Sequence, residues 1–322
     1  MKRREFFGVL GGGAAWPLVA RAEPLPVIGF VHPGSADEER LRVDAFLSGL
    51  NEAGYIPGQN VNIEYRWFDG DFDRVPTLLS GLINKRVTVI VAAGGSVVAA
   101  KAMGTNIPIV FTSGSDPIQQ GIVTSLSHPD GNMTGVAFFA TALGPKQLEL
   151  LLAVAPAAKL LGFVTHSGYP YAKFRIDELQ AAAHALERRV IVKSVASRAE
   201  LEPTFAAFEQ QGVGGLIVSA DPILQEWREE LAALAARHAM PACYGVREFV
   251  LAGGLMSYGS SLPWAYHQVG VYTARILKGE KPADLPVVQA VTVELVLNLK
   301  AAKNLGFSFP LTLLGRADEV IE

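Results

Sequence analysis

Glycine and hydroxyl residues follow three stretches of the sequence that have the pattern of buried β-strands. These residues are Gly94, Gly95 and Ser96 after VTVIVAA, Thr112, Ser113 and Ser115 at the end of IPIVFTSGS, and Ser35 after VIGFV. In open α/β sheets, ligands bind beyond the carboxyl ends of the strands, where helix N-terminal amides point outward. Amides and hydroxyls together suit a carboxylate, so we interpret these residues as candidate carboxylate ligands. The alternative is that each of them only caps a helix.

Two Asp-Pro pairs indicate a second kind of chemistry. The segments IVFTSGSDPI and LIVSADPIL each place a serine and an Asp-Pro pair just after an apolar strand pattern. Asp116 and Asp221 are therefore candidates to bind an ammonium group, with Glu248 as the next candidate. Aspartate followed by proline is also typical of a helix N-cap with proline in the first turn, and both interpretations stay open.

Aromatic residues and a few other polar residues complete the candidate set. Tyr169, Tyr171, Tyr244 and Tyr258 follow strand patterns of the second half or a predicted crossover, and they are candidates to wall an apolar slot. Ordinary core or rim packing is the alternative for this class of side chain. His166 follows the strand pattern LLGFVT and is a candidate cleft residue or a capping residue. Asn132 and Thr134 lie in GNMTG, where we expect the chain to cross between two regions.

The elements that position these residues alternate between strand and helix. VTVIVAA, SVVAAKAM and IPIVFTS form one predicted βαβ unit, and a second α/β series begins after residue 140. Apolar runs without polar alternation are typical of parallel strands buried on both faces. We therefore predict an α/β protein with two Rossmann-like lobes, each with a parallel sheet, joined by three crossover segments. The predicted lobes are residues 23–136 with 259–286, and residues 137–258 with 287–322.

The N-terminal residues 1–22 have the pattern of a cleaved export signal. They contain Arg3-Arg4, a short Gly/Ala-rich apolar segment and the small-x-small site Ala20-Arg21-Ala22. The arginine pair resembles a twin-arginine signal, and a Sec signal is the close alternative. Its removal takes away four basic and one acidic side chain, so the net charge moves from −3 to −6. We expect a periplasmic, monomeric protein that does not bind nucleic acid.

Catalytic and metal-binding motifs are absent from the sequence. There is no HExxH, CxxC or G-x-S-x-G, the six histidines are scattered, and Cys243 is the one cysteine. We therefore expect no metal, no cofactor and no enzyme activity. The alternative is an exported α/β enzyme, with Ser96, His166 and Asp221 at candidate strand ends.

A set of longer motifs carries a family resemblance over nearly the whole chain. The set is GYIPGQNVNIEYRW, VIVAAGGS, IPIVFTSGSDPI, GNMTGV, VREFVLAGGLMSYG, ARILKGEKPADLPV and RADEVIE. It resembles the substrate-binding proteins of ABC importers typified by aromatic-amino-acid binders, which have the type I periplasmic-binding fold. The resemblance implies an amino-acid-like ligand held between two lobes, hinge closure, and an ABC permease of the inner membrane as partner. A ligand sensor for a membrane receptor is the alternative role.

Overall fold

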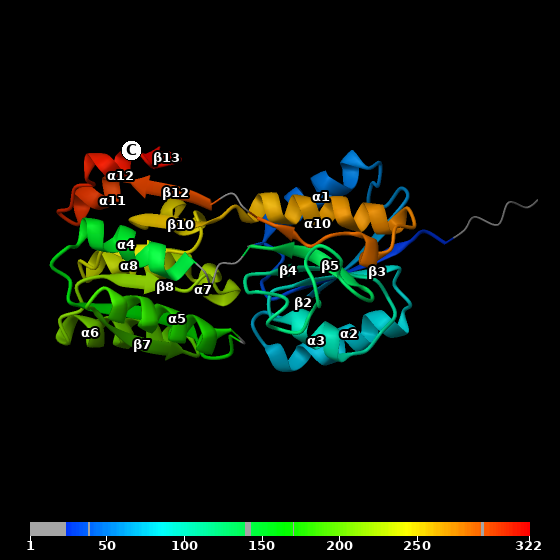
Figure 1. Cartoon of the computed structure of the whole chain (residues 1–322), viewed down its shortest axis with the longest axis horizontal. Helices are drawn as coiled ribbons and strands as arrows, with labels where there is room; N and C mark the ends of the chain where they lie inside the picture. Colours follow the sequence, from blue (N-terminus) through cyan, green and yellow to red (C-terminus); the bar gives the residue numbers. More distant parts are fainter. Residues whose placement is uncertain (1–23, 38, 139–142, 170, 291–292) are drawn as a thin grey trace, which may run out of the picture.

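The protein contains two α/β bodies that lie end to end (Figure 1). The structure is a computed structural model, and it describes residues 24–37, 39–138, 143–169, 171–290 and 293–322. The predicted export signal in residues 1–22 lies outside the described residues. Among the described helices, none combines the length and the apolar composition needed to cross a membrane.

The first body is built on a six-stranded, parallel sheet with the order β11-β5-β4-β3-β1-β2. β3, β4 and β5 are buried along their whole length, whereas the more polar β2 lies at an edge and is only partly buried. The alternation of polar and apolar residues in β2 is typical of a strand near a sheet edge. The strands are β1 (Val27–His32), β2 (Asn62–Trp67), β3 (Val89–Ala93), β4 (Ile109–Ser113), β5 (Met133–Ala137) and β11 (Val288–Gln289).

Helices cover both faces of the first sheet. One apolar cluster joins the sheet to α1 and α10, and a second cluster joins it to α2 and α3. The helices are α1 (Arg40–Glu52), α2 (Val75–Asn84), α3 (Ser96–Ala102) and α10 (Leu262–Leu277), with short 3₁₀ turns at Phe72–Arg74 and Pro282–Asp284.

The second body is built on a seven-stranded sheet with the order β13-β12-β10-β9-β8-β6-β7. β12 runs antiparallel to β10, and the other neighbours are parallel. The strands are β6 (Leu160–His166), β7 (Arg189–Val195), β8 (Leu216–Val218), β9 (Ala242–Tyr244), β10 (Met256–Ser260), β12 (Val293–Asn298) and β13 (Glu319–Ile321). The helices are α4 (Gly144–Val154), α5 (Ala172–Ala185), α6 (Leu201–Gln210), α7 (Pro222–Glu226), α8 (Arg228–Arg237), α9 (Glu248–Leu251), α11 (Leu299–Asn304) and α12 (Leu311–Leu314), with a 3₁₀ turn at Arg198–Glu200.

Both sheets share one topology over their first five strands. Counted along the chain within each body, the strand order is 2-1-3-4-5 in each sheet. The two Asp-Pro segments are not at matching places in this topology, because Asp116 follows the fourth strand of its sheet and Asp221 follows the third. The sequence repeat was therefore a local similarity and not a structural equivalence.

The chain passes between the two sheets three times, between β5 and β6, between β10 and β11, and between β11 and β12. The sequence assigned two short segments to one lobe, whereas in the structure they pair with the sheet of the other lobe. Gly259–Ser260 pair with β12 in the second sheet, and Val288–Gln289 pair with β5 in the first. The reason is that β10 and β11 keep their ladder hydrogen bonds up to the points where the chain leaves each sheet.

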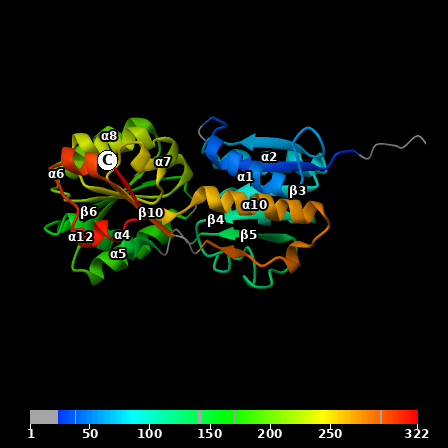
Figure 2. The same cartoon turned by 90° about the horizontal axis from the view of Figure 1, so that it is seen from above.

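The crossing of α1 and α10 holds the first body together through two glycines. Figure 2 shows the two helices side by side over the first sheet. A Cβ added at Gly49 would lie 2.1 Å from the carbonyl oxygen of His267, and one added at Gly270 would lie 2.1 Å from that of Phe46. Only residues without a side chain permit the two backbones to approach this closely.

We predict that Gly49→Ala lowers the free energy of unfolding by about 1–3 kcal/mol, because the new methyl group overpacks the crossing of α1 and α10. The control is Gly81→Ala on α2, where an added Cβ meets no atom within 4 Å. The control should be neutral or stabilising by up to about 1 kcal/mol, because alanine favours the helix. Urea denaturation measures both changes, and equal stability of the two variants would contradict the close crossing.

Candidate functional site

The carboxyl ends of the central strands of both sheets meet at a seam between the two bodies. At Gly94, which follows β3, an added Cβ would lie 3.6 Å from the rings of both Pro33 and Pro222. At Gly70, which follows β2, an added Cβ would lie 2.3 Å from Ile223 of α7. The seam is therefore closely packed, with backbone from the first body against side chains from the second.

A small central cavity lies in this seam. Its volume is about 30 Å³, which is room for two or three water molecules. This volume is too small for an amino acid. Among the lining residues are Pro33, Arg42, Gly94, Thr112 and Tyr266 of the first body and Tyr169, Ala220, Pro222 and Gln225 of the second.

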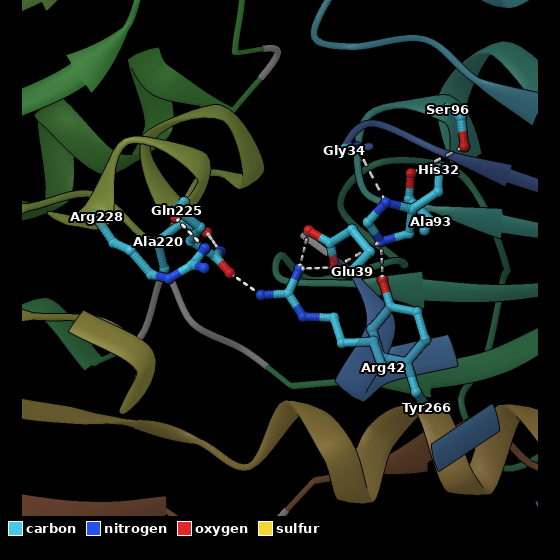
Figure 3. Close-up of polar contacts among 10 residues, drawn as sticks. All are labelled: His32, Gly34, Glu39, Arg42, Ala93, Ser96, Ala220, Gln225, Arg228 and Tyr266. Atoms are coloured by element: carbon cyan, nitrogen blue, oxygen red, sulfur yellow. Dashed lines mark hydrogen bonds and ion pairs between the residues drawn. The ribbon is translucent and has the colours of Figure 1, made fainter. Parts of the chain in front are cut away.

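Arg42 of α1 is a buried cation that reaches across the seam (Figure 3). Its Nη1 donates to both carboxylate oxygens of Glu39, at 2.8 and 2.6 Å, and its Nη2 donates to Oε1 of Gln225 on α7. Burial alone would lower the pKa of Arg42, but the attraction of Glu39 and Glu248 outweighs burial and raises the pKa. Arg42 is therefore a charged guanidinium at the cavity wall. Its charged partner is Glu39, and its neutral partner is Gln225.

His32 and Tyr266 form a second buried polar contact beside Arg42 (Figure 3). The Nδ1 of His32 accepts from the backbone N–H of Gly34 at 3.0 Å, so the neutral ring carries its proton on Nε2. Nε2 donates to the Tyr266 hydroxyl at 2.7 Å and lies 3.6 Å from Glu39. Burial lowers the pKa of His32 to about 4. The imidazole is therefore neutral at neutral pH.

Three of the residues expected from the sequence line the central cavity. They are Gly94, Thr112 and Tyr169. Gly94 has a φ of +56°, which favours glycine at this turn. Tyr169 is half-buried, and its ring lies perpendicular to that of Tyr171 at 5.3 Å. Residues that follow predicted strands thus form part of the wall of the central cavity.

Several other expected residues use their polar atoms inside their own loops. Gly95 directly precedes α3, and the Ser96 hydroxyl donates to the Ala93 carbonyl at 2.9 Å. The Ser113 hydroxyl donates to the carbonyl of Ser115 at 3.0 Å, and the carbonyl of Ser35 accepts from Glu39. These contacts hold the loops together, but neither the Ser96 nor the Ser113 hydroxyl caps a helix, because each donates to a carbonyl.

Both Asp-Pro aspartates accept hydrogen bonds from backbone amides. Asp116 Oδ1 accepts from the backbone N–H of Ile118 at 2.8 Å. Asp221 is fully buried, and its two oxygens accept from the N–H groups of Leu224 at 2.8 Å and His166 at 3.1 Å. Burial raises the pKa of Asp221 to about 7, although these hydrogen bonds oppose the rise. Asp221 lies between Ala220 and Pro222, which line the central cavity, but its own carboxylate is engaged by these backbone groups.

Four of the expected residues make their contacts in loops or cores of a single body. Asn132 donates to the carbonyls of Thr105 and Ile107 before the start of β4, and Thr134 donates to the Leu285 carbonyl. Tyr244 is fully buried and stacks on Phe249, and Tyr258 packs against a core cluster of the second body. Asn132 lies at the opposite end of the strands, before β5 begins. The tyrosine side chains point into cores.

The remaining two expected residues differ in position. Glu248, on α9, lines a charged groove of about 260 Å³ at the seam, together with Glu39, Arg42 and Arg228. His166 ends β6 and packs edge-on against Trp227. Its Nδ1 accepts from the N–H of Gly168, and its ring also contacts the backbone of Ala196.

The described contacts do not form a catalytic chain from Ser96, His166 and Asp221. The Ser96 hydroxyl is bonded to Ala93, and Asp221 contacts the backbone of His166 and not its ring. Within the described ranges, no group of three or more His, Cys, Asp or Glu side chains is placed to hold a metal ion.

Sequence reasoning missed four residues of the seam, namely His32, Arg42, Gln225 and Tyr266. His32 had a usable signal, because it is the polar residue at the carboxyl end of the first strand. Arg42 and Gln225 lie on helices and meet only across the seam, 183 positions apart. No local pattern marks such a pair.

Known proteins resemble this chain over most of its length. A family model described as ABC transporter substrate binding protein matches residues 26–321. The chain belongs to this family. A curated tyrosine-binding protein of Clostridioides difficile (strain R20291) is 24% identical over 261 residues, which is 81% of this chain and 75% of the relative.

Two solved structures of substrate-binding proteins show the same architecture. An ABC domain from Streptococcus pneumonia in complex with L-Trp is 26% identical and has a TM-score of 0.82, over 92% of this chain and 100% of that one. The ligand-free, open structure of a substrate binding protein from Clostridium difficile is 23% identical and has a TM-score of 0.65, over 92% and 99% of the two chains. The predicted type I periplasmic-binding fold is confirmed, and these ABC substrate-binding relatives are binding proteins and not enzymes.

We predict that His32 makes the stability of this substrate-binding protein fall as the pH decreases from about 6.5 to about 4, the window between its ordinary and its folded pKa, whereas the raised pKa of Asp221 contributes with the opposite sign in the same window. In this window the unfolded chain binds a proton on His32 that the folded chain excludes. The loss should reach about 3 kcal/mol. His32→Gln should remove this part of the pH dependence, and a change at the exposed His128 should not. Denaturant titrations at several pH values measure it, and parallel profiles for all three proteins would contradict the assignment.

We predict that Asp221→Asn lowers the free energy of unfolding by about 1–3 kcal/mol, because an amide has one acceptor oxygen for the two N–H groups that the carboxylate now binds. Ligand affinity should change less than threefold. The control is Asp116→Asn, which keeps an acceptor for Ile118 and should lose only a few tenths of a kcal/mol. A large loss of affinity with unchanged stability would restore the ligand role of Asp221.

Proposed function

We propose that this substrate-binding protein is the periplasmic solute-binding component of an ABC importer and that it captures a small amino-acid-like ligand between its two bodies. An ABC permease in the inner membrane is then its partner, and the protein acts as a monomer without a cofactor. The export signal in residues 1–22 and the twin-arginine route remain predictions from the sequence.

The observation that carries the proposal is the buried Arg42–Glu39 pair at the seam. A zwitterionic ligand needs one cationic and one anionic partner, and a guanidinium binds a carboxylate with two parallel hydrogen bonds. In our proposal the ligand carboxylate takes the place of Gln225 as the acceptor for Arg42. Gly94 and Thr112 then lie beside it, which keeps part of the predicted carboxylate site.

Hinge closure is the second part of the proposal. The central cavity of about 30 Å³ must enlarge before an amino acid can enter. Three chain passages connect the bodies, and separation of the bodies would break the Arg42–Gln225 contact. The lower TM-score with the ligand-free, open structure than with the L-Trp complex supports such a motion. Rotation of two packed bodies about short connections is a common way to bury a ligand.

The relatives support the class of ligand. One is a curated tyrosine-binding protein, and another was solved with L-Trp. The sensor role remains the alternative, since a membrane receptor would recognise the same closed form. The enzyme alternative has less support, because the Ser96, His166 and Asp221 side chains serve loop and cap hydrogen bonds.

We predict that calorimetry with L-tryptophan, L-tyrosine, L-phenylalanine and L-glutamine detects binding of at least one amino acid, whereas D-glucose does not bind. Arg42→Gln should weaken that binding by about thirtyfold or more, because it removes one member of a buried charge pair. Arg40→Gln, an exposed change on the same helix, is the control. Small-angle scattering should show a smaller radius of gyration with ligand.

The experiment can contradict each part of the proposal. Binding of the sugar but of none of the amino acids would overturn the class of ligand. Equal affinity of the two arginine variants would overturn the role of Arg42. An unchanged scattering profile at saturation would overturn hinge closure.

A further inference from the structure

A second cavity, the Ser115 pocket, lies in the seam beside the central cavity. Its volume is about 170 Å³, several times that of the central one. Its walls are the loop after β4 in the first body and the first turn of α5 in the second. The lining residues are Ser115, Asp116, Gln119, Gln120, Tyr171 and Phe174.

Three buried polar atoms of this pocket have no hydrogen-bond partner. They are Ser115 Oγ, Gln120 Nε2 and Tyr171 Oη. Ser115 is only 4% exposed and Tyr171 only 6% exposed, so both are removed from bulk solvent. Buried polar groups without partners are costly, and in native proteins each one calls for a physical reason. Their location in the wall of one cavity indicates that they serve a molecule bound there.

The chemistry of these atoms is neutral and can both donate and accept. Gln120 Oε1 lies 3.4 Å from the Ser113 hydroxyl, whose proton goes to the nearer Ser115 carbonyl at 3.0 Å, and the Gln120 amide carries both a donor and an acceptor. Burial raises the pKa of Tyr171 to about 12, and the Gln120 side chain beside its hydroxyl partly offsets the rise. Neutral donors and acceptors match a neutral polar group, because a buried full charge requires an opposite charge.

The two cavities are neighbours with different chemistry. Gly114 and Tyr169 line the central cavity, whereas the adjacent Ser115 and the ring partner Tyr171 line the Ser115 pocket. Arg42, a buried charge, lies on the central side. A ligand with its charged head at Arg42 would thus direct its other end past the tyrosine pair toward neutral hydrogen-bonding groups.

We propose that the Ser115 pocket selects amino acids whose side chain ends in a neutral hydrogen-bonding group, a phenol hydroxyl or a primary carboxamide. This inference rests on the proposed function. Ser115, Gln120 and Tyr171 bind that terminal group, and Phe174 lies against the apolar part of the side chain. An amino acid that lacks the group leaves the three polar atoms unpaired, which is a strong basis for discrimination.

The test compares ligands that differ mainly in the terminal group. Calorimetry is done with L-tyrosine against L-phenylalanine and with L-glutamine against L-methionine. The wild-type protein should prefer the hydrogen-bonding member of at least one pair by tenfold or more. The double variant Ser115→Ala/Tyr171→Phe should reduce that preference below threefold, by weaker binding of the preferred ligand and unchanged binding of the apolar one.

The controls separate this inference from loss of the fold and from failure of the proposed function. Tyr171→Phe keeps the ring, and Ser127→Ala/Tyr55→Phe makes the same chemical change outside the pocket and should keep the preference. Equal affinities within each pair for the wild-type protein would overturn the inference and leave the proposed function standing. A preference that survives in the double variant would also overturn it. If the wild-type protein binds none of the four amino acids, the proposed ligand class fails and the inference fails with it.

Discussion

The close crossing of α1 and α10 is the constraint on which the binding seam depends. Gly49 and Gly270 bring the two helix backbones into contact, so neither helix can shift without breaking that contact. α1 carries Arg42, and α10 carries Tyr266. The crossing therefore fixes the distance between the buried cation and the phenol that holds His32. A loosely packed pair of helices would leave these polar groups without fixed partners.

The buried charges at the seam are held by contacts at the start of α1 and across to the second body. A buried arginine is tolerated only when its hydrogen bonds are satisfied, and here Glu39 supplies two acceptors from the same helix end. Gln225 supplies a third acceptor from the other body, and it is neutral. A ligand carboxylate is a stronger acceptor than an amide. In our proposal the same contact holds the two bodies together and gives way to a ligand.

Polar residues at the ends of strands have two different roles in this protein. Asp221 accepts from an amide at the start of α7, because such amides need acceptors that the helix itself does not supply, whereas Asp116 closes a turn and Ser96 donates to a loop carbonyl. Thr112 and Tyr169 instead face the central cavity. Ser115 and Tyr171 are buried with unpaired hydroxyls. The same residue types therefore serve folding in one loop and recognition in the next.

The sequence by itself determined the fold class, the two-body plan and several strand ends, because buried parallel strands require uninterrupted apolar runs and helices begin at recognisable caps. Gly94, Thr112 and Tyr169, which follow predicted strands, line the central cavity. Only the tertiary structure decided which polar residues face across the seam. Arg42 meets Gln225 over 183 positions, and His32 meets Tyr266 over 234. Such contacts depend on strand order and on the packing of α1 against α10, neither of which leaves a local trace in the sequence.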